Sequence, residues 1–162
     1  MSLTPAQLQT LGTYIASVPA WNALPNNSDT ASFISDELAK NASPAFTVWR
    51  PDVTADETGN AWVGTDIDGM SALNMQRLQL LLASSPQGLF DMGRIDRRAG
   101  FENPFGTNAN NASRVAMRAA WKRLANVAEK LFATGTGSDA SPGVMTFTGR
   151  VSYPEVIAAR GA

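Results

Sequence analysis

Apolar residues recur at helical spacing over much of the chain. Steps of three and four positions mark residues 4–19, the stretch that ends near Lys40, and residues 71–84, with a shorter stretch over 90–102. The clearest stripe lies in 112–133, where the apolar residues are Met117, Trp121, Leu124, Ala128 and Leu131. The pattern predicts a mainly α-helical protein with a compact helical domain over 1–134, whose last helix, over 112–133, is the longest.

The C-terminal 29 residues change character. Residues 134–143 are small and rich in Gly and Ser, which is typical of a flexible linker. Met145, Phe147 and Val151 then alternate with polar residues as in a short strand, and Ser152-x-x-Glu155 is a capping box that opens a terminal helix. Residues 135–162 are therefore expected to form a linker and a β or extended arm with a terminal helix.

The arm has two possible destinations. It could reach a neighbouring subunit, in which case Met145, Phe147, Val151 and Tyr153 would form part of a subunit interface. It could also fold back on the core of its own chain. The first alternative predicts that deletion of 143–162 leaves the core folded and abolishes assembly.

Composition narrows the possible chemistry. The 162 residues, enough for one domain, include no Cys and no His. Disulfides, thiolate zinc sites and cysteine nucleophiles are therefore excluded, and the commonest general base and metal ligand is missing. Carboxylates, hydroxyls, Lys and Arg remain.

The motifs that could carry chemistry are incomplete. Asp66-x-Asp68-Gly69 resembles the start of a calcium loop, but its twelfth position is Arg77 where Glu is required. Gly135-x-Gly137 follows a helix and is not followed by Lys, unlike a phosphate-binding loop. Asp52, Asp56 and Glu57 could form an acid–base pair, but we favour the interpretation that they lie on a solvated acidic turn. We expect no catalytic residue, cofactor or metal site, and hence not an enzyme.

The net charge of −1 conceals an asymmetry along the chain. Residues 1–70 hold eight acidic and two basic groups, whereas residues 71–162 hold six acidic and eleven basic ones. Opposite charges on two halves would favour head-to-tail association of copies, unless folding mixes them over one surface. Arg114, Arg118 and Lys122 similarly form either a solvated helix face or a docking face for an acidic partner.

No stretch of the sequence indicates a membrane. The first basic residue is Lys40, so the N-terminus lacks the charged region of a signal peptide. The longest purely aliphatic run, Leu80–Ala83, is far shorter than the roughly 18 residues that cross a bilayer. A soluble product is expected.

Several blocks of sequence carry a resemblance. These are residues 2–11 (SLTPAQLQTL), 42–50 (ASPAFTVWR), 98–100 (RAG), 128–137 (AEKLFATGTG), 140–142 (ASP) and 145–147 (MTF). Together they resemble a family of small, uncharacterised structural proteins of tailed bacteriophages and prophages. The likeness weakens between Thr58 and Met92.

The resemblance implies a component of the virion or of its assembly in the host cytoplasm. Within that setting we expect a head-to-tail connector, an adaptor or neck subunit that forms a homo-oligomeric ring next to the portal. Its partners would be its own copies and portal, tail or head-closure proteins, with genomic DNA only passing through the channel. Alternatives are a capsid or tail decoration protein and an assembly factor absent from the virion.

Overall fold

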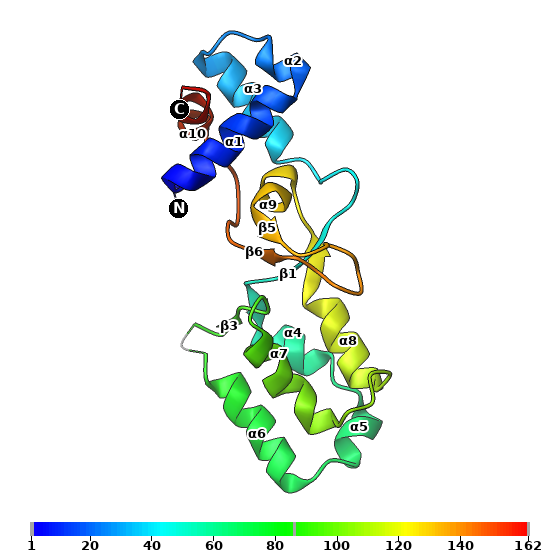
Figure 1. Cartoon of the computed structure of the whole chain (residues 1–162). Helices are drawn as coiled ribbons and strands as arrows, with labels where there is room; N and C mark the ends of the chain where they lie inside the picture. The colour runs from blue at the N-terminus through cyan, green and yellow to red at the C-terminus, as the bar shows by residue number, and fades with distance from the viewer. Residues whose placement is uncertain (1, 86, 162) are drawn as a thin grey trace. The chain divides into compact units, whose positions relative to one another are not determined.

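The computed structural model describes residues 2–85 and 87–161 and confirms a mainly α-helical protein with a C-terminal helix (Figure 1). The chain divides into two compact units. Unit 1 combines Met1–Thr47 with Leu124–Ala162, and unit 2 is Val48–Arg123. The expected division at residue 134 is therefore replaced by one in which both ends of the chain build the same unit.

Unit 1 is a helical cluster with a small hairpin. Its elements are α1 (Pro5–Ser17), α2 (Pro19–Asn22), α3 (Ser28–Leu38), α9 (Val127–Phe132), β5 (Ala133–Thr134), β6 (Val144–Met145) and α10 (Tyr153–Arg160). Thr4 and Gln7 form a capping box at the start of α1, and Ser152 and Glu155 form another at α10. Strands β5 and β6 pair antiparallel, with Ala133 opposite Met145.

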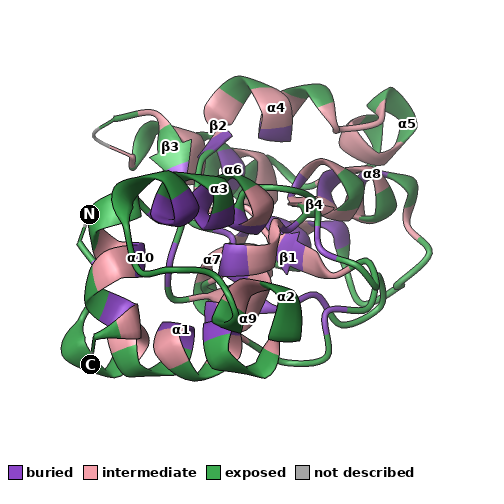
Figure 2. Ribbon diagram, turned by 90° about the horizontal axis from the view of Figure 1, so that it is seen from above, coloured by how far each residue is buried: buried purple, intermediate pink, exposed green. Residues whose placement is uncertain are grey.

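The core of unit 1 joins residues from both ends of the sequence. Leu11 and Ile15 of α1 and Ile34 and Leu38 of α3 are buried against residues of the C-terminal segment, which are Phe147, Val151, Val156 and Ala159. Figure 2 shows such buried positions on the helices of this unit, with exposed residues on their other sides. The C-terminal segment thus folds back on the core of its own chain, the alternative to a free arm.

The stretch predicted to be a flexible linker is a packed loop. The ring of Phe46 lies where Cβ atoms on Gly137 and Gly143 would come within 2.1 and 2.6 Å of it, so neither position has room for a side chain. The Thr47 N–H donates to the Gly137 carbonyl, and the Gly143 N–H donates to the Thr47 carbonyl. Small residues here serve close packing, which the composition alone does not distinguish from flexibility.

Helix α1 crosses α10 at Gly12. A Cβ atom at this position would lie 2.2 Å from the Ala159 carbonyl oxygen, which is backbone and cannot rotate away. Gly12→Ala should therefore destabilise the protein by about 1–3 kcal/mol, the usual cost of overpacking, although Ala is the better helix former by about 1 kcal/mol. Chemical denaturation measures the free energy of unfolding.

The matched control is Gly59→Ala in a helix of unit 2. A Cβ atom there meets nothing within 4 Å, so the same substitution should be neutral or stabilising. Equal effects at the two positions would show that α1 and α10 do not approach each other as described.

Unit 2 contains the middle of the chain. Its elements are β2 (Val53–Thr54), α4 (Ala55–Asn60), α5 (Gly64–Asp68), α6 (Ala72–Ala83), β3 (Leu89–Phe90), α7 (Ile95–Glu102), a 3₁₀ turn η1 (Asn103–Phe105) and α8 (Ala112–Ala120). Strands β2 and β3 pair antiparallel. The core gathers Leu78, Phe90, Phe101, Met117 and Trp121. The Trp121 indole N–H donates to the Thr58 hydroxyl, so this buried polar group is satisfied.

The continuous helix predicted over 112–133 is wrong. Helix α8 ends at Ala120, the chain is extended in β4 (Lys122–Leu124), and α9 begins at Val127. Strand β4 pairs with β1 (Thr47–Trp49), and these are the segments in which the chain passes between the units. Asn126 and Glu129 form a capping box that starts a new helix, so the apolar stripe spans two helices with a strand between them.

The units do not inherit the charge asymmetry of the sequence. Unit 1 contains six acidic and four basic residues, and unit 2 contains eight and nine, which gives net charges of −2 and +1. Folding therefore mixes the charges, because the acidic N-terminal residues and part of the basic C-terminal half enter one unit. None of the helices in the described part of the chain has the length and apolar character needed to cross a membrane.

Candidate functional site

Two of the three basic residues expected on one helix face, Arg114 and Arg118, form ion pairs within unit 2. Helix α8 places Arg114 and Arg118 one turn apart, and both bind Glu102 at the end of α7. Arg118 Nε and Nη2 each lie 2.6 Å from a carboxylate oxygen of Glu102, and Arg114 Nη2 lies 2.9 Å from one. Lys122 is separate from this cluster, in strand β4. The cluster joins two helices of unit 2.

Glu102 is only 7% exposed, yet it is held as a carboxylate. Burial by itself would raise its pKa, but the hydrogen bonds donated by Arg118 and Arg114 outweigh burial and place the pKa below its ordinary value. The same contact raises the pKa of Arg118. The ion-pair cluster is therefore charged at neutral pH and has a structural role.

The residues expected on the arm divide between core and surface. Phe147 packs edge to face on Phe132, with ring centroids 5.4 Å apart, and Val151 is fully buried. Met145 is partly buried in β6. Tyr153 begins α10 and is 51% exposed. Of these four residues, Tyr153 is the one whose side chain is mainly at the surface.

The acidic turn near Thr54 is a helix start. Glu57 accepts hydrogen bonds from the Thr54 N–H and hydroxyl, and Arg50 Nη1 lies 2.7 Å from its Oε1. Arg50 also pairs with Asp52 at 3.3 Å. The hydrogen bonds that Glu57 accepts, first that from Arg50 and then those from Thr54, lower its pKa to about 2. A carboxylate so stabilised is a poor general base at neutral pH.

This carboxylate predicts a pH dependence of stability. The pKa of Glu57 is depressed from 4.5 to about 2 in the folded protein. Its contribution to stability is therefore fully present above about 4.5 and is lost as the pH falls towards 2. Glu57→Gln should lower the melting temperature at neutral pH and should differ less from wild type below pH 3 (about one unit above that pKa). A Glu57 pKa near 4.5 by NMR titration would contradict these contacts.

Asp66 anchors the start of α8. Its Oδ2 accepts hydrogen bonds from the Ser113 N–H at 2.9 Å and hydroxyl at 2.7 Å, and these contacts lower its pKa. Asp68 lies nearby on the exposed side of α5. The Asp-x-Asp-Gly sequence is thus the C-terminal end of α5, and its Asp66 holds the first turn of α8. Among the described residues, no group of three or more Asp and Glu side chains is placed to hold a metal ion.

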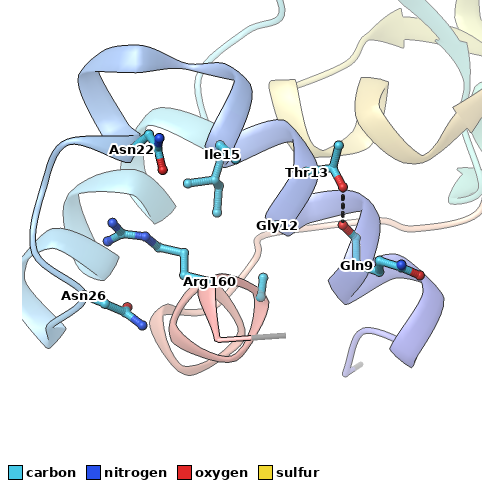
Figure 3. Close-up of a pocket in the computed structure, with 9 residues that line it drawn as sticks. Gln9, Gly12, Thr13, Ile15, Asn22, Asn26 and Arg160 are labelled. Atoms are coloured by element: carbon cyan, nitrogen blue, oxygen red, sulfur yellow. Dashed lines mark hydrogen bonds between the residues drawn. The ribbon is translucent and has the colours of Figure 1, made fainter.

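A pocket of about 410 Å³ lies in unit 1, shown in Figure 3. Gln9, Gly12 and Thr13 line it from α1, and Arg160 enters from α10. The Arg160 guanidinium donates to the carbonyls of Leu24 at 2.6 Å, Pro25 at 3.0 Å and Trp21 at 3.4 Å. It therefore satisfies backbone acceptors of α2 and of the loop before α3, and the pocket lies where α10 packs against these segments.

A larger groove, of about 550 Å³, lies in unit 2 between α6 and the α7–η1 segment. Its apolar lining comes from Leu80, Leu81 and Pro104, and Gly100 leaves α7 close to the Leu81 side chain. Arg77 lies at the same groove one turn before Leu81. Leu73 and Leu80, a heptad apart on α6, are 57% and 71% exposed. This groove and the exposed stripe of α6 form the candidate functional site.

The sequence does not single out this site, because α6 has the apolar pattern of an ordinary core helix. It carries six Leu or Met residues, and only Leu78 among them is fully buried. The excess of apolar residues over what one core-facing stripe needs was the available signal.

The chain also has no match among protein-family models, curated proteins or solved structures.

Proposed function

We propose that this chain is a structural protein of a tailed-bacteriophage virion, a head-to-tail connector subunit that forms a ring next to the portal. The resemblance in the N-terminal and C-terminal blocks supplies the phage setting. The observation that carries an assembly role is the surface of α6, where Leu73 and Leu80 are more than half exposed and Leu80 lines the groove together with Leu81 and Pro104.

Such a surface has a cost that contact with another protein would remove. Single exposed leucines are ordinary, but leucines that border a groove with apolar walls are typical of protein contact sites. Burying a leucine side chain contributes about 1.5–3 kcal/mol. Leu73 and Leu80 are placed to give this energy to an interface and not to the core of unit 2.

The carboxylates engaged in the structure fit the same role. Glu57, Glu129 and Glu155 close capping boxes, and Glu102 and Asp66 anchor α8. A connector works by matching symmetric surfaces and needs no acid–base group. It must also let DNA slide, and the pairing of Arg114 and Arg118 with Glu102 reduces the free positive charge that would bind phosphates.

Electron microscopy of purified protein, alone and mixed with portal complexes, tests this proposal. We expect rings, or a ring added to the portal. Leu80→Asp should prevent ring formation while the circular dichroism spectrum stays that of wild type, because this side chain is at the surface. Protein that stays monomeric and does not bind portal complexes would overturn the connector. Binding to assembled capsids or tails instead would favour a decoration protein.

A further inference from the structure

We infer that the α6–α7 groove of one copy receives the exposed face of α3 from a second copy of this chain. This inference rests on the proposed assembly function and identifies the partner of the candidate site. It joins two different surfaces, one on unit 2 and one on unit 1, each of which has a feature that its own unit leaves unmatched.

The groove contributes an unmatched positive charge. Arg77 has no hydrogen-bond or ion-pair partner within the described part of the chain, unlike Arg114 and Arg118 in the same unit. It lies between Leu73 and Leu80 on the exposed side of α6. An occupant of the groove would therefore combine an apolar side chain with a carboxylate about one helical turn away.

Helix α3 presents that combination. Phe33 is 46% exposed although it lies in the middle of the helix, and Asp29 and Asp36 are exposed on either side of it. Arg150 holds Asp36 through an ion pair. Asp29, by contrast, has no partner in the residues that the structure describes. The face therefore carries an exposed aromatic ring and an unmatched carboxylate one turn before it.

The spacing on the two helices agrees. Asp29 and Phe33 are four residues apart, as are Arg77 and Leu81, and four residues advance a helix by about 6 Å. With the two helices roughly parallel, Phe33 meets Leu81 when the Asp29 carboxylate meets the Arg77 guanidinium one turn earlier. Attraction between unmatched opposite charges fixes the register, and the ring supplies buried apolar area.

A second copy is the occupant because both halves of the contact are present on every chain. A contact between two different surfaces leaves one of each free on every dimer, so association continues into a closed ring or a filament. This is the geometry that a connector subunit needs. A contact of one surface with itself would stop at a dimer.

Charge reversal tests the contact in purified protein by sedimentation velocity. Asp29→Lys and Arg77→Glu alone should each weaken self-association at least tenfold, because each places like charges together. The double variant should restore association to within a few-fold of wild type. Asp68→Lys serves as the matched control for Asp29→Lys, since this exposed side chain lies outside both surfaces. If the single variants lose self-association and the double variant does not recover it, the pairing is overturned.

Cysteine cross-linking provides a measurement that weak association does not defeat, because the natural chain contains no Cys. A mixture of Asp29→Cys and Arg77→Cys proteins should form the mixed disulfide dimer under mild oxidation many times faster than a mixture of Asp29→Cys and Asp68→Cys. Equal rates in the two mixtures would overturn the inference.

The two proposals fail in different ways. If wild-type protein assembles into rings or enters particles, but charge reversal is not compensated and the cross-link does not form, the α3–α6 contact is wrong and the connector stands. If wild-type protein neither self-associates nor binds portal complexes, and the cross-link does not form, both are overturned.

Discussion

A chain that ends at Ser152 should lose the fold of unit 1. The deletion removes Val156 and Ala159 from the buried cluster that contains Leu11 and Ile15 of α1, and it removes the helix against which α1 packs. Each large aliphatic side chain returned to water costs about 1.5–3 kcal/mol, and a domain has only about 5–15 kcal/mol of net stability. The loss should exceed what unit 1 can sustain.

Two polar contacts disappear with the same helix. Glu155 accepts a hydrogen bond from the Leu3 N–H at 2.8 Å, and Arg160 satisfies the carbonyls between α2 and α3. Hydrogen exchange followed by mass spectrometry should show lost protection throughout α1 and α3. Peptides from Val48–Arg123 should stay protected, because the core of unit 2 contains no residue of α10.

A chain ending at Arg160 is the control, since it keeps all of α10 and should exchange like wild type. Full protection of α1 and α3 in the shorter chain would mean that α10 is dispensable, as the free-arm alternative required. If deleting 143–162 abolishes assembly, the first explanation is therefore that unit 1 unfolds, and not that an interface is lost.

Glu102→Ala should destabilise unit 2 by about 3 kcal/mol, the lower part of the range for removing one partner of a buried ion pair. The substitution leaves Arg114, which is largely buried, and Arg118 close together with no carboxylate between them. Urea denaturation followed by Trp fluorescence measures the effect, because Trp121 lies in the core of this unit.

Asp96→Ala provides the matched control. Asp96 also pairs with an arginine, Arg94, at 2.6 Å, but both side chains are mainly exposed. Exposed pairs contribute about 0–1 kcal/mol. A similar small effect at both positions would show that the Glu102 cluster is open to solvent and not the joint between α7 and α8.

Local sequence signals predicted the helices that depend on local contacts. The capping box at Ser152 predicted the start of α10, and the helical spacing over 4–19 and 71–84 predicted α1 and α6. The same kind of signal at Asn126 was masked by an apolar stripe that continues across it. The stripe predicts which side of a segment is buried, and it is silent about whether one helix or two present that side.

Contacts between distant parts of the chain were out of reach. Nothing in the sequence near Gly12 indicates that the backbone of α10 lies so close that a Cβ atom has no room. Nothing near Phe46 indicates that Gly137 and Gly143 pack against its ring. The charge asymmetry was misleading for the same reason, because it follows the order of residues whereas the units combine the two ends. Arg114 and Arg118 were chosen for their charge, and the carboxylate that binds them is on another helix.

The composition of purified phage particles tests the central claim, that this chain works as a structural part of a virion, most directly. Quantitative mass spectrometry of virions produced by cells that carry the gene should find the protein in several copies per particle, at a fixed ratio to the portal protein. Particles that are complete and infectious, and that contain none of it, would contradict the claim and favour an assembly factor.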